Sequence, residues 1–141
     1  FFEEYCMEDA DYVMVIMGSA AGTAKDTVDA LRAKGIKAGL LKVRMFRPFP
    51  GEQMAAALKN AKVIAVMDRT ESFNTVNGPL GADVKTVLYD NKSDALIVNY
   101  AYGLAGRDVT VESLTSVYED MLQIEKDGCV GETYRYLSLR D

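Results

Sequence analysis

The segment "YVMVIMGSAAGTAKDTVDALRAKG", residues 12–35, contains the alternation that decides the fold. Its first seven residues form a continuous apolar run up to a glycine, which is typical of a strand buried on both faces of a sheet. The residues that follow place Ala24, Val28 and Leu31 on one face of a helix, and Gly35 supplies a natural stop. This order of buried strand and amphipathic helix predicts one βα unit of a parallel sheet.

The same alternation recurs three more times along the chain. Further strands are predicted within residues 37–46, 62–68 and 95–101, and the helices that follow them begin near Pro50, Pro79 and Thr110. Four strand–helix repeats predict right-handed crossovers and a parallel sheet covered by helices on both faces. The apolar pattern alone does not settle whether residues 1–6 add an edge strand, and it predicts no element in residues 129–141.

Composition places the chain among globular proteins. Of its 141 residues, 49% are hydrophobic and 26% are charged, and the formal net charge is −5. This acidic balance disfavours a general surface for nucleic acid or an anionic membrane, because both partners would repel it. No apolar run approaches the roughly 20 residues of a membrane helix, and no secretory signal pattern is present, so we expect a cytoplasmic protein.

Residue types that carry catalysis or bind metals are scarce. The chain has no histidine, which is the commonest general base and metal ligand, and its two cysteines, Cys6 and Cys129, form no C-x-x-C pair. We therefore expect no catalytic residue and no metal ligand here. The first residues, "FFEEYC", include no methionine, from which we expect the chain to be part of a longer protein.

Arginines gather where the predicted strands end. The stretch "LLKVRMFRPFP", residues 40–50, begins as a strand and ends in a rigid segment rich in arginine and phenylalanine, a combination favoured at buried protein contacts. Four of the seven arginines lie at or just after the carboxyl ends of predicted strands, with acidic residues among them. The predicted contact residues at this edge are Arg44, Arg47, Arg69, Arg107, Asp68 and Asp108.

Two interpretations of these arginines stay open. Ion pairs within the domain or with a neighbouring domain are the plain interpretation. A site for a phosphate or carboxylate is the alternative, because the planar guanidinium group suits both anions. The loop "GSAAGT", residues 18–23, matches neither common phosphate-binding motif, and its small residues are explained by close packing of helix on sheet.

Several segments carry a resemblance to a known family. The most specific are residues 41–50, 68–69 with 78–80, and 102–110. In the same order and over almost the whole chain, the sequence resembles the second core domain of pyruvate:ferredoxin oxidoreductase, or pyruvate synthase. That domain is similar to the C-terminal domain of transketolase. The resemblance implies an α/β fold of three layers, α/β/α, with a mostly parallel five-stranded sheet whose antiparallel edge strand is residues 1–6.

The resemblance also implies a role. The family oxidatively decarboxylates pyruvate with coenzyme A, giving acetyl-coenzyme A, carbon dioxide and reduced ferredoxin, and the complete enzyme uses thiamine diphosphate, magnesium and iron–sulfur clusters. This chain has no G-D-G run for the magnesium diphosphate and no cysteine series for a cluster. We therefore expect a non-catalytic assembly domain that holds no cofactor and is inactive alone. Its expected partners are other domains or subunits of the parent enzyme, with ferredoxin as partner of the whole enzyme.

Alternatives to this role remain. The chain could be the equivalent domain of another thiamine diphosphate enzyme, either an oxidoreductase for a different 2-oxoacid or a relative of transketolase. The segment "DRTESFNTVNGPL", residues 68–80, favours the pyruvate branch. A third class is a free-standing flavodoxin-like module that binds a nucleotide or anion. In the preferred interpretation residues 1–128 form the domain and residues 129–141 form a tail that leads to the next domain.

Overall fold

The computed structural model describes residues 2–18, 20–44, 50–69, 78–103 and 109–137. These residues form one six-stranded sheet whose spatial order is β1-β3-β2-β4-β5-β6. Four central strands run parallel, β6 continues them at one edge, and β1 lies antiparallel to β3 at the other edge. The strands are β1 Phe2–Tyr5, β2 Tyr12–Met17, β3 Ala38–Val43, β4 Val63–Asp68, β5 Leu96–Ala101 and β6 Tyr134–Tyr136.

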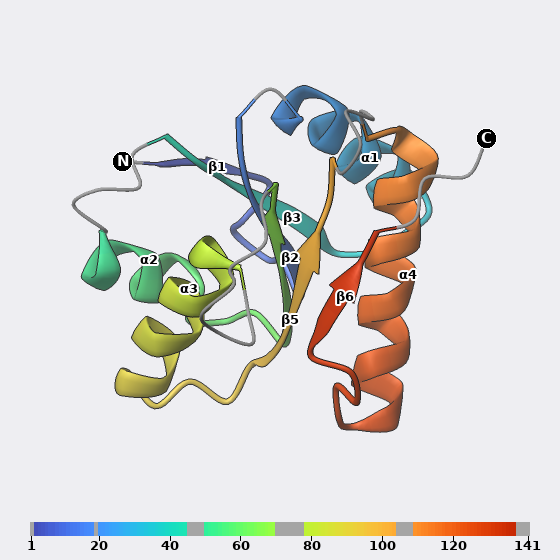
Figure 1. The fold of residues 1–141 in the computed structure, drawn as a ribbon. Helices are drawn as coiled ribbons and strands as arrows, with labels where there is room; N and C mark the ends of the chain where they lie inside the picture. Colours follow the sequence, from blue (N-terminus) through green and yellow to red (C-terminus); the bar gives the residue numbers. More distant parts are fainter. Residues whose placement is uncertain (1, 19, 45–49, 70–77, 104–108, 138–141) are drawn as a thin grey trace.

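Helices cover both faces of the sheet and complete three layers (Figure 1). They are α1 Ala21–Ala33, α2 Gly51–Ala57, α3 Pro79–Asp90 and α4 Val111–Asp127. One apolar core lies between the sheet and α1 with α4, and a second lies between the sheet and α2 with α3. The central strands feed both cores because successive side chains point to opposite faces, which explains their continuous apolar sequence.

The order of the strands creates a topological switch between β2 and β4. From β2 the chain passes through α1 to β3 on one side, whereas from β4 it passes through α3 to β5 on the other side. The two helices lie on opposite faces of the sheet. The connections that leave the carboxyl ends of β2 and β4 therefore diverge. Open α/β sheets bind ligands in the crevice at such a point.

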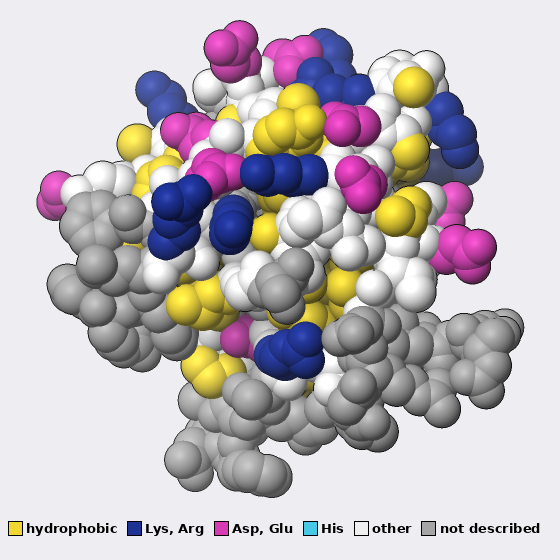
Figure 2. All heavy atoms as spheres, turned by 90° about the horizontal axis from the view of Figure 1, so that it is seen from above, with side chains coloured by type: hydrophobic (Ala, Val, Ile, Leu, Met, Phe, Trp, Pro, Cys, Tyr) yellow, Lys and Arg dark blue, Asp and Glu magenta, His cyan; other side chains and the backbone are white. Residues whose placement is uncertain are grey.

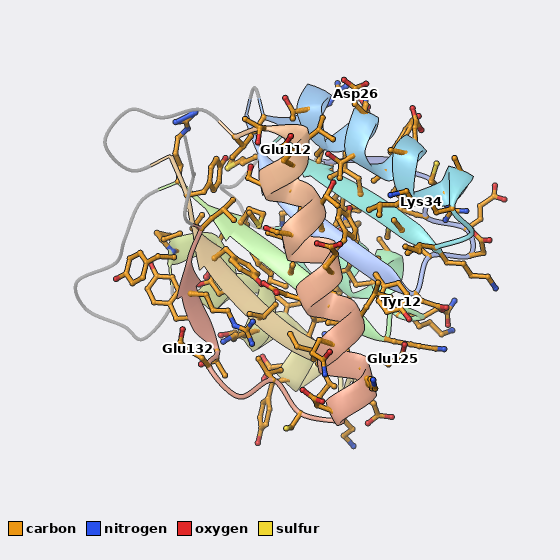
Figure 3. The ribbon with its side chains drawn as sticks, turned by 90° about the vertical axis from the view of Figure 1, so that its right-hand side faces the viewer. Tyr12, Asp26, Lys34, Glu112, Glu125 and Glu132 are labelled. Carbon is orange, nitrogen blue, oxygen red and sulfur yellow. The ribbon has the colours of Figure 1, made fainter. Side chains whose placement is uncertain are left out.

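The longest helix, α4, is fixed at both ends. Thr110 and Ser113 form a reciprocal capping box at its start, and Gly128 ends it in the left-handed conformation with φ of 74°. Near its other end, Glu125 accepts a hydrogen bond from Tyr12 at the start of β2 (Figure 3). Burial, followed by this bond to a carboxylate, raises the pKa of Tyr12 to about 12. The helix is thereby tied to the amino end of the sheet.

The fold confirms the predicted α/β architecture and its antiparallel edge, but the sheet has six strands where five were predicted. The apolar pattern predicted no element after Gly128, yet Tyr134–Tyr136 pair with Asn99–Ala101 as β6. Pro50, predicted as the first residue of a helix, instead precedes α2 as its N-cap. No helix among the described residues is long and apolar enough to cross a membrane.

Candidate functional site

The structure brings together three of the six residues predicted at the strand ends. Arg44 directly follows β3, Asp68 is the last residue of β4, and Arg69 follows it. All three lie at the carboxyl edge of the sheet because β3 and β4 are parallel to the same neighbour, β2. Arg47, Arg107 and Asp108 lie outside the described residues.

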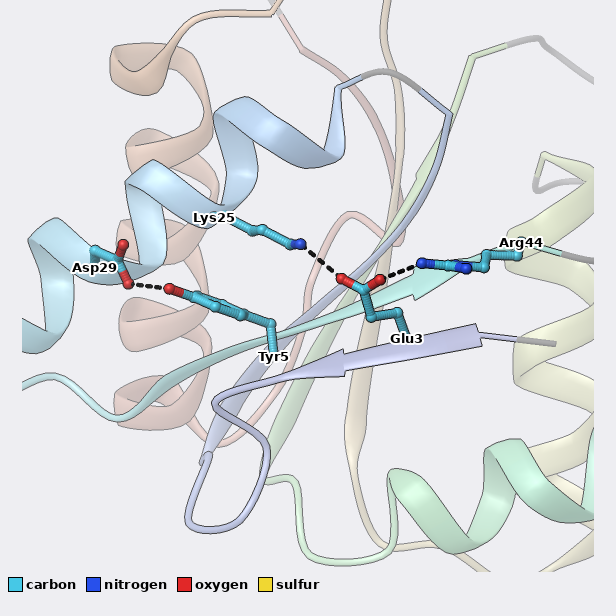
Figure 4. A network of polar contacts seen from close by, with 5 residues as sticks. All are labelled: Glu3, Tyr5, Lys25, Asp29 and Arg44. Atoms are coloured by element: carbon cyan, nitrogen blue, oxygen red, sulfur yellow. Dashed lines mark hydrogen bonds and ion pairs between the residues drawn. The ribbon is translucent and has the colours of Figure 1, made fainter.

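Arg44 belongs to a network that crosses three elements. Glu3 of the edge strand β1 accepts from Lys25 of α1 at 2.6 Å and also pairs with Arg44 (Figure 4). Lys25, and after it Arg44, lower the pKa of the Glu3 carboxyl below its ordinary value. The Arg44 side chain is still 60% exposed. It is therefore held in place by Glu3 and remains accessible.

A second contact secures the same edge strand. Tyr5 of β1 donates a hydrogen bond to Asp29 of α1 at 2.7 Å, and the ammonium group of Lys25 lies 5.5 Å from the centre of the Tyr5 ring (Figure 4). The bond to a carboxylate is the main reason why the pKa of Tyr5 is raised to about 12. Through these contacts α1 fixes the strand that carries Glu3.

Asp68 has a different role from the exposed arginines. Only 6% of it is exposed, and its carboxylate accepts hydrogen bonds at 2.8 Å from the backbone N–H groups of Leu80 and Gly81, in the first turn of α3. The side-chain amide of Asn99, on β5, donates to the same carboxylate at 2.9 Å. Since the first N–H groups of a helix lack partners within it and attract negative charge, Asp68 caps α3 from the adjoining strand.

Asn99 and two glycines complete this cap. The Asn99 amide oxygen accepts from the N–H of Gly78 at 2.7 Å, and its amide nitrogen also donates to the Val66 carbonyl at 2.8 Å. A Cβ atom on Gly78 would lie 2.5 Å from the carboxyl of Asp68, and one on Gly81 would overlap the amide of Asn99. The glycines of "NGPLG", residues 77–81, therefore permit the close approach of α3 to β4 and β5.

Arg69 lies over an aromatic ring at the switch point. Its guanidinium carbon is 5.5 Å from the centre of the Tyr102 ring. Tyr102 follows β5 and is itself buried, and its hydroxyl donates to the Met17 carbonyl at the end of β2 at 3.2 Å. Burial is the main cause that raises the pKa of Tyr102, and the charge of Arg69 opposes it. The ring thus connects three strand ends beneath an exposed arginine.

A hollow of about 750 Å³ opens between these groups. It extends over the ends of β3, β2 and β4, with cationic side chains from the outer two strands and a glycine in the middle. The described residues that line it are Met17, Gly18, Lys42, Val43, Arg44 and Arg69. Figure 2 views the molecule from this end and shows basic and acidic side chains next to one another on the described surface.

Sequence reasoning found the two described arginines but missed their supports. Glu3 and Lys42 face each other in the antiparallel register of β1 and β3, a pairing that required the direction of the edge strand. Tyr102 directly follows a predicted strand and belongs to the segment 102–110 that carries the resemblance, but its contact with Arg69 was not predicted. Asn99 was not singled out, although a single amide within the apolar run of β5 is a sign of an internal hydrogen-bond network.

The metal-ligating side chains of this chain do not fit the cofactors of the family that it resembles. An iron–sulfur cluster is held by about four cysteine thiolates, whereas the chain has two cysteines, Cys6 before β2 and Cys129 after α4. No group of three or more metal-ligating side chains lies together in the part of the chain that the structure describes. We therefore derive no chemical step through a metal or cluster in this domain.

The fold defines the class of protein. The chain is a doubly wound α/β domain of the kind seen in a split-gene transketolase, whose structure matches 86% of this chain with a TM-score of 0.61 at 20% identity. The same fold occurs in the 2-oxoglutarate:ferredoxin oxidoreductase of Magnetococcus marinus, which matches 87% of this chain with a TM-score of 0.66 at 17% identity. These matches cover 41% and 20% of the longer chains.

A family model for pyruvate:ferredoxin oxidoreductase core domain II matches residues 10–114, and the chain belongs to this family. Pyruvate synthase subunit PorA is 42% identical in Methanosarcina barkeri and in Thermotoga maritima, over 97% and 100% of this chain. Ketoisovalerate oxidoreductase subunit VorA of Pyrococcus furiosus is 41% identical over 95% of it. The chain spans about a third of these relatives, 34%, 35% and 34% of their respective lengths.

Proposed function

We propose that the chain is a non-catalytic assembly domain of a 2-oxoacid:ferredoxin oxidoreductase that acts on pyruvate. Family membership carries this proposal, since the domain matches PorA subunits over nearly its whole length. The proposed parent reaction is the oxidative decarboxylation of pyruvate with coenzyme A, which yields acetyl-coenzyme A, carbon dioxide and reduced ferredoxin. Ferredoxin is then a partner of the parent enzyme, and the proposed location is the cytoplasm.

A second candidate substrate follows from the comparisons. VorA of Pyrococcus furiosus is 41% identical to this chain, almost as similar as the PorA subunits at 42%. The whole-chain identity therefore separates the ketoisovalerate and pyruvate branches poorly. We retain a branched-chain 2-oxoacid as the alternative substrate of the parent enzyme.

Thiamine diphosphate, magnesium and iron–sulfur clusters belong, in this proposal, to the rest of the parent enzyme. The shortage of cysteine and the absence of histidine in this chain support that division. The chain accounts for about a third of the PorA subunits that it matches. Other parts of the subunit, and other subunits, are then available to supply the cofactor sites.

The edge formed by the strand ends is the proposed contact with those parts. The predicted contacts Arg47 and Arg107 provide cations that suit carboxylates and main-chain carbonyls. Arginine is enriched at protein interfaces, where its planar group loses little freedom on docking. The domain would thus position neighbouring domains without touching substrate.

Substrate choice is tested in the purified parent enzyme. We expect pyruvate to drive coenzyme A-dependent reduction of ferredoxin with a kcat/KM at least about ten-fold above that of 2-oxoisovalerate, a difference of about 1.4 kcal/mol in transition-state free energy. The reverse order would assign the branched-chain alternative. The absence of both activities from an assembled enzyme that contains its cofactors would overturn the proposed function.

The assembly role has its own test. We expect Arg47→Ala to weaken assembly of the parent enzyme, measured as the fraction of assembled particles in analytical ultracentrifugation at falling protein concentration. Lys34→Ala is the matched control, because Lys34 is an exposed cation at the C-terminal end of α1, far from the strand-end edge (Figure 3). Equal assembly of both variants and the wild type would remove Arg47 from the interface.

A further inference from the structure

We propose that the hollow at the switch point is a binding site for a phosphate-bearing small molecule, whose phosphate group lies over Gly18 between Arg44 and Arg69. This inference goes beyond an assembly role because it gives this domain a ligand of its own. It does not depend on which 2-oxoacid the parent enzyme uses. The proposal is carried by the position of the hollow, its charge and the way in which its arginines are held.

The position is the one that the strand order favours. Gly18 follows β2 and Arg69 follows β4, the two neighbouring strands whose helices leave toward opposite faces. The hollow lies at their carboxyl ends, and it extends to Lys42 and Arg44 at the end of β3. Ligands of open α/β sheets bind in this crevice because the diverging connections leave space there.

Gly18 leaves room between the two arginines. Its φ is 87°, a conformation that favours glycine, and a Cβ atom placed on it would meet nothing within 4 Å. Neighbouring strands are about 4.8 Å apart, so the backbone positions of residues on the two strands flanking β2 are separated by about 10 Å. Two guanidinium groups that approach from either side of a glycine can grip one phosphate.

Each arginine is oriented by its own domain before any ligand arrives. Glu3, which Lys25 also contacts, fixes Arg44 from β1. The buried ring of Tyr102 supports Arg69 from below and is itself bonded to the carbonyl of Met17. Side chains that are already ordered lose less entropy when they bind a ligand. This cluster is therefore better suited to ligand binding than a freely solvated patch of charges would be.

The charge balance favours a phosphate over a single carboxylate. Lys42, Arg44 and Arg69 line the hollow, and Glu3, beside it, is balanced by Lys25. The nearby carboxylate of Asp68 is buried and accepts hydrogen bonds from the N–H groups of Leu80 and Gly81 in α3. The apolar side chains of Met17 and Val43 also line the hollow, whose volume of about 750 Å³ exceeds the space of one carboxylate and suits a small organic molecule.

The test uses pyrophosphate as the probe and the purified protein that contains this chain. Arginines are modified with phenylglyoxal, and the rate at each position is read by peptide mass spectrometry. At ten times the dissociation constant, we expect pyrophosphate to slow modification of Arg44 and Arg69 by about ten-fold. Arg32 and Arg135, which lie elsewhere in the fold with side chains 27% and 23% exposed, are internal controls and should keep their rates.

A variant and a second anion test whether the protection is specific to this site and to phosphate. Lys42→Met should weaken the protection at least about five-fold while leaving the thermal unfolding midpoint unchanged, because Lys42 lines the hollow and is not among the buried core residues. Protection by acetate equal to that by pyrophosphate would overturn the phosphate site and indicate a carboxylate contact. Equal slowing at all four arginines, or no slowing at Arg44 and Arg69, would also overturn it. The substrate assay of the parent enzyme is unaffected by these outcomes, so the two proposals fail separately.

Discussion

Asp68 illustrates how one side chain decides what an edge can bind. The N-terminus of α3 offers backbone N–H groups and a positive dipole end, which would attract an external anion. The carboxylate of Asp68 occupies that position from the end of β4 and is held by Asn99. The anion site at α3 is thus filled internally. The cations that line the hollow around Gly18 are Lys42, Arg44 and Arg69.

Replacing Asp68 with alanine should therefore destabilise the fold. The change leaves the N–H groups of Leu80 and Gly81 and the amide of Asn99 without their acceptor in a buried site. We expect a loss of about 3 kcal/mol in the free energy of unfolding, measured by urea titration. Asp94→Ala, at an exposed aspartate before β5, should stay within about 0.5 kcal/mol of the wild type. Equal midpoints for the two variants would contradict the capping role.

The packing of α3 on the sheet depends on glycine, whereas α1 tolerates a side chain. A methyl group on Gly81 would overlap the buried amide of Asn99, but one on Gly22, exposed in the first turn of α1, would meet nothing within 4 Å. We expect Gly81→Ala to cost about 2 kcal/mol. Gly22→Ala should instead stabilise the chain by about 0.5 kcal/mol, because alanine favours the helix. Urea titration should therefore give changes of opposite sign in the free energy of unfolding for the two variants. Changes of the same sign would contradict this explanation.

The edge strand β1 should make the fold sensitive to acid. The pKa of Glu3 is lowered from its ordinary value of 4.5 by its bonds with Lys25 and Arg44, so the folded state favours the ionised carboxylate. That contribution is complete above pH 4.5 and is lost as the pH falls through the lower folded value. We expect Glu3→Gln to flatten the loss of stability below pH 4.5, measured by thermal unfolding across pH.

A double-mutant comparison isolates this effect. Lys25→Met with Arg44→Met removes both partners of Glu3 and should flatten the acid response to the same degree. Adding Glu3→Gln to that variant should then change nothing further. An acid response that survives in all three variants would assign the pH dependence to other carboxylates, such as Asp9 or Glu125, whose pKa values are also lowered.

Most of the elements could be predicted because burial imposes a pattern on them. The continuous apolar runs of β2 and β4 and the stripe of α4 each identify an element without any knowledge of its neighbours. The strand Tyr134–Tyr136 has three residues with an arginine in the middle, too short for such a pattern. The direction of β1 also gave no signal, since an edge strand of mixed polarity fits either orientation.

The candidate site was predictable only in part, for a related physical reason. The position of Arg44 and Arg69 follows from where their strands end, so sequence was sufficient to place them at one edge. Whether a polar side chain at that edge faces inward depends on contacts between distant residues. Asp68 and Leu80 are 12 residues apart in the chain, and Tyr102 bonds to the carbonyl of Met17 across 85 residues. Local patterns do not encode such approaches.

The two ends of the described chain close the two edges of the sheet. β1 covers β3 at one edge, and β6 covers β5 at the other. Unpaired edges invite pairing with other chains, so short flanking strands protect the longer parallel strands between them. The sheet is therefore complete only when the segment after Gly128 is included. That observation bears on the predicted boundary, which assigned residues 1–128 to the domain and residues 129–141 to a connecting tail.

Truncation after Gly128 should test where the domain ends. Without β6 the sheet loses the bonds from Asn99 N–H to the Thr133 carbonyl and from Leu137 N–H to the Ala101 carbonyl, both 2.9 Å. The hydroxyl of Tyr100, bonded to Asp120 on α4 at 2.6 Å, would also become more exposed to water. We expect the truncated chain to lose at least about 2 kcal/mol of unfolding free energy in urea.

A cut after Leu137 is the matched control for this experiment. It retains β6 and the turn before it, which Arg135 braces by donating to the carbonyls of Glu132 and Val130, both at 2.8 Å. Its urea midpoint should equal that of the full chain. If the cut after Gly128 were equally harmless, residues 129–141 would be a connecting tail and the domain would end with α4. A selective loss instead makes β6 an integral strand, because the paired edge contributes to the cooperative unit that unfolds.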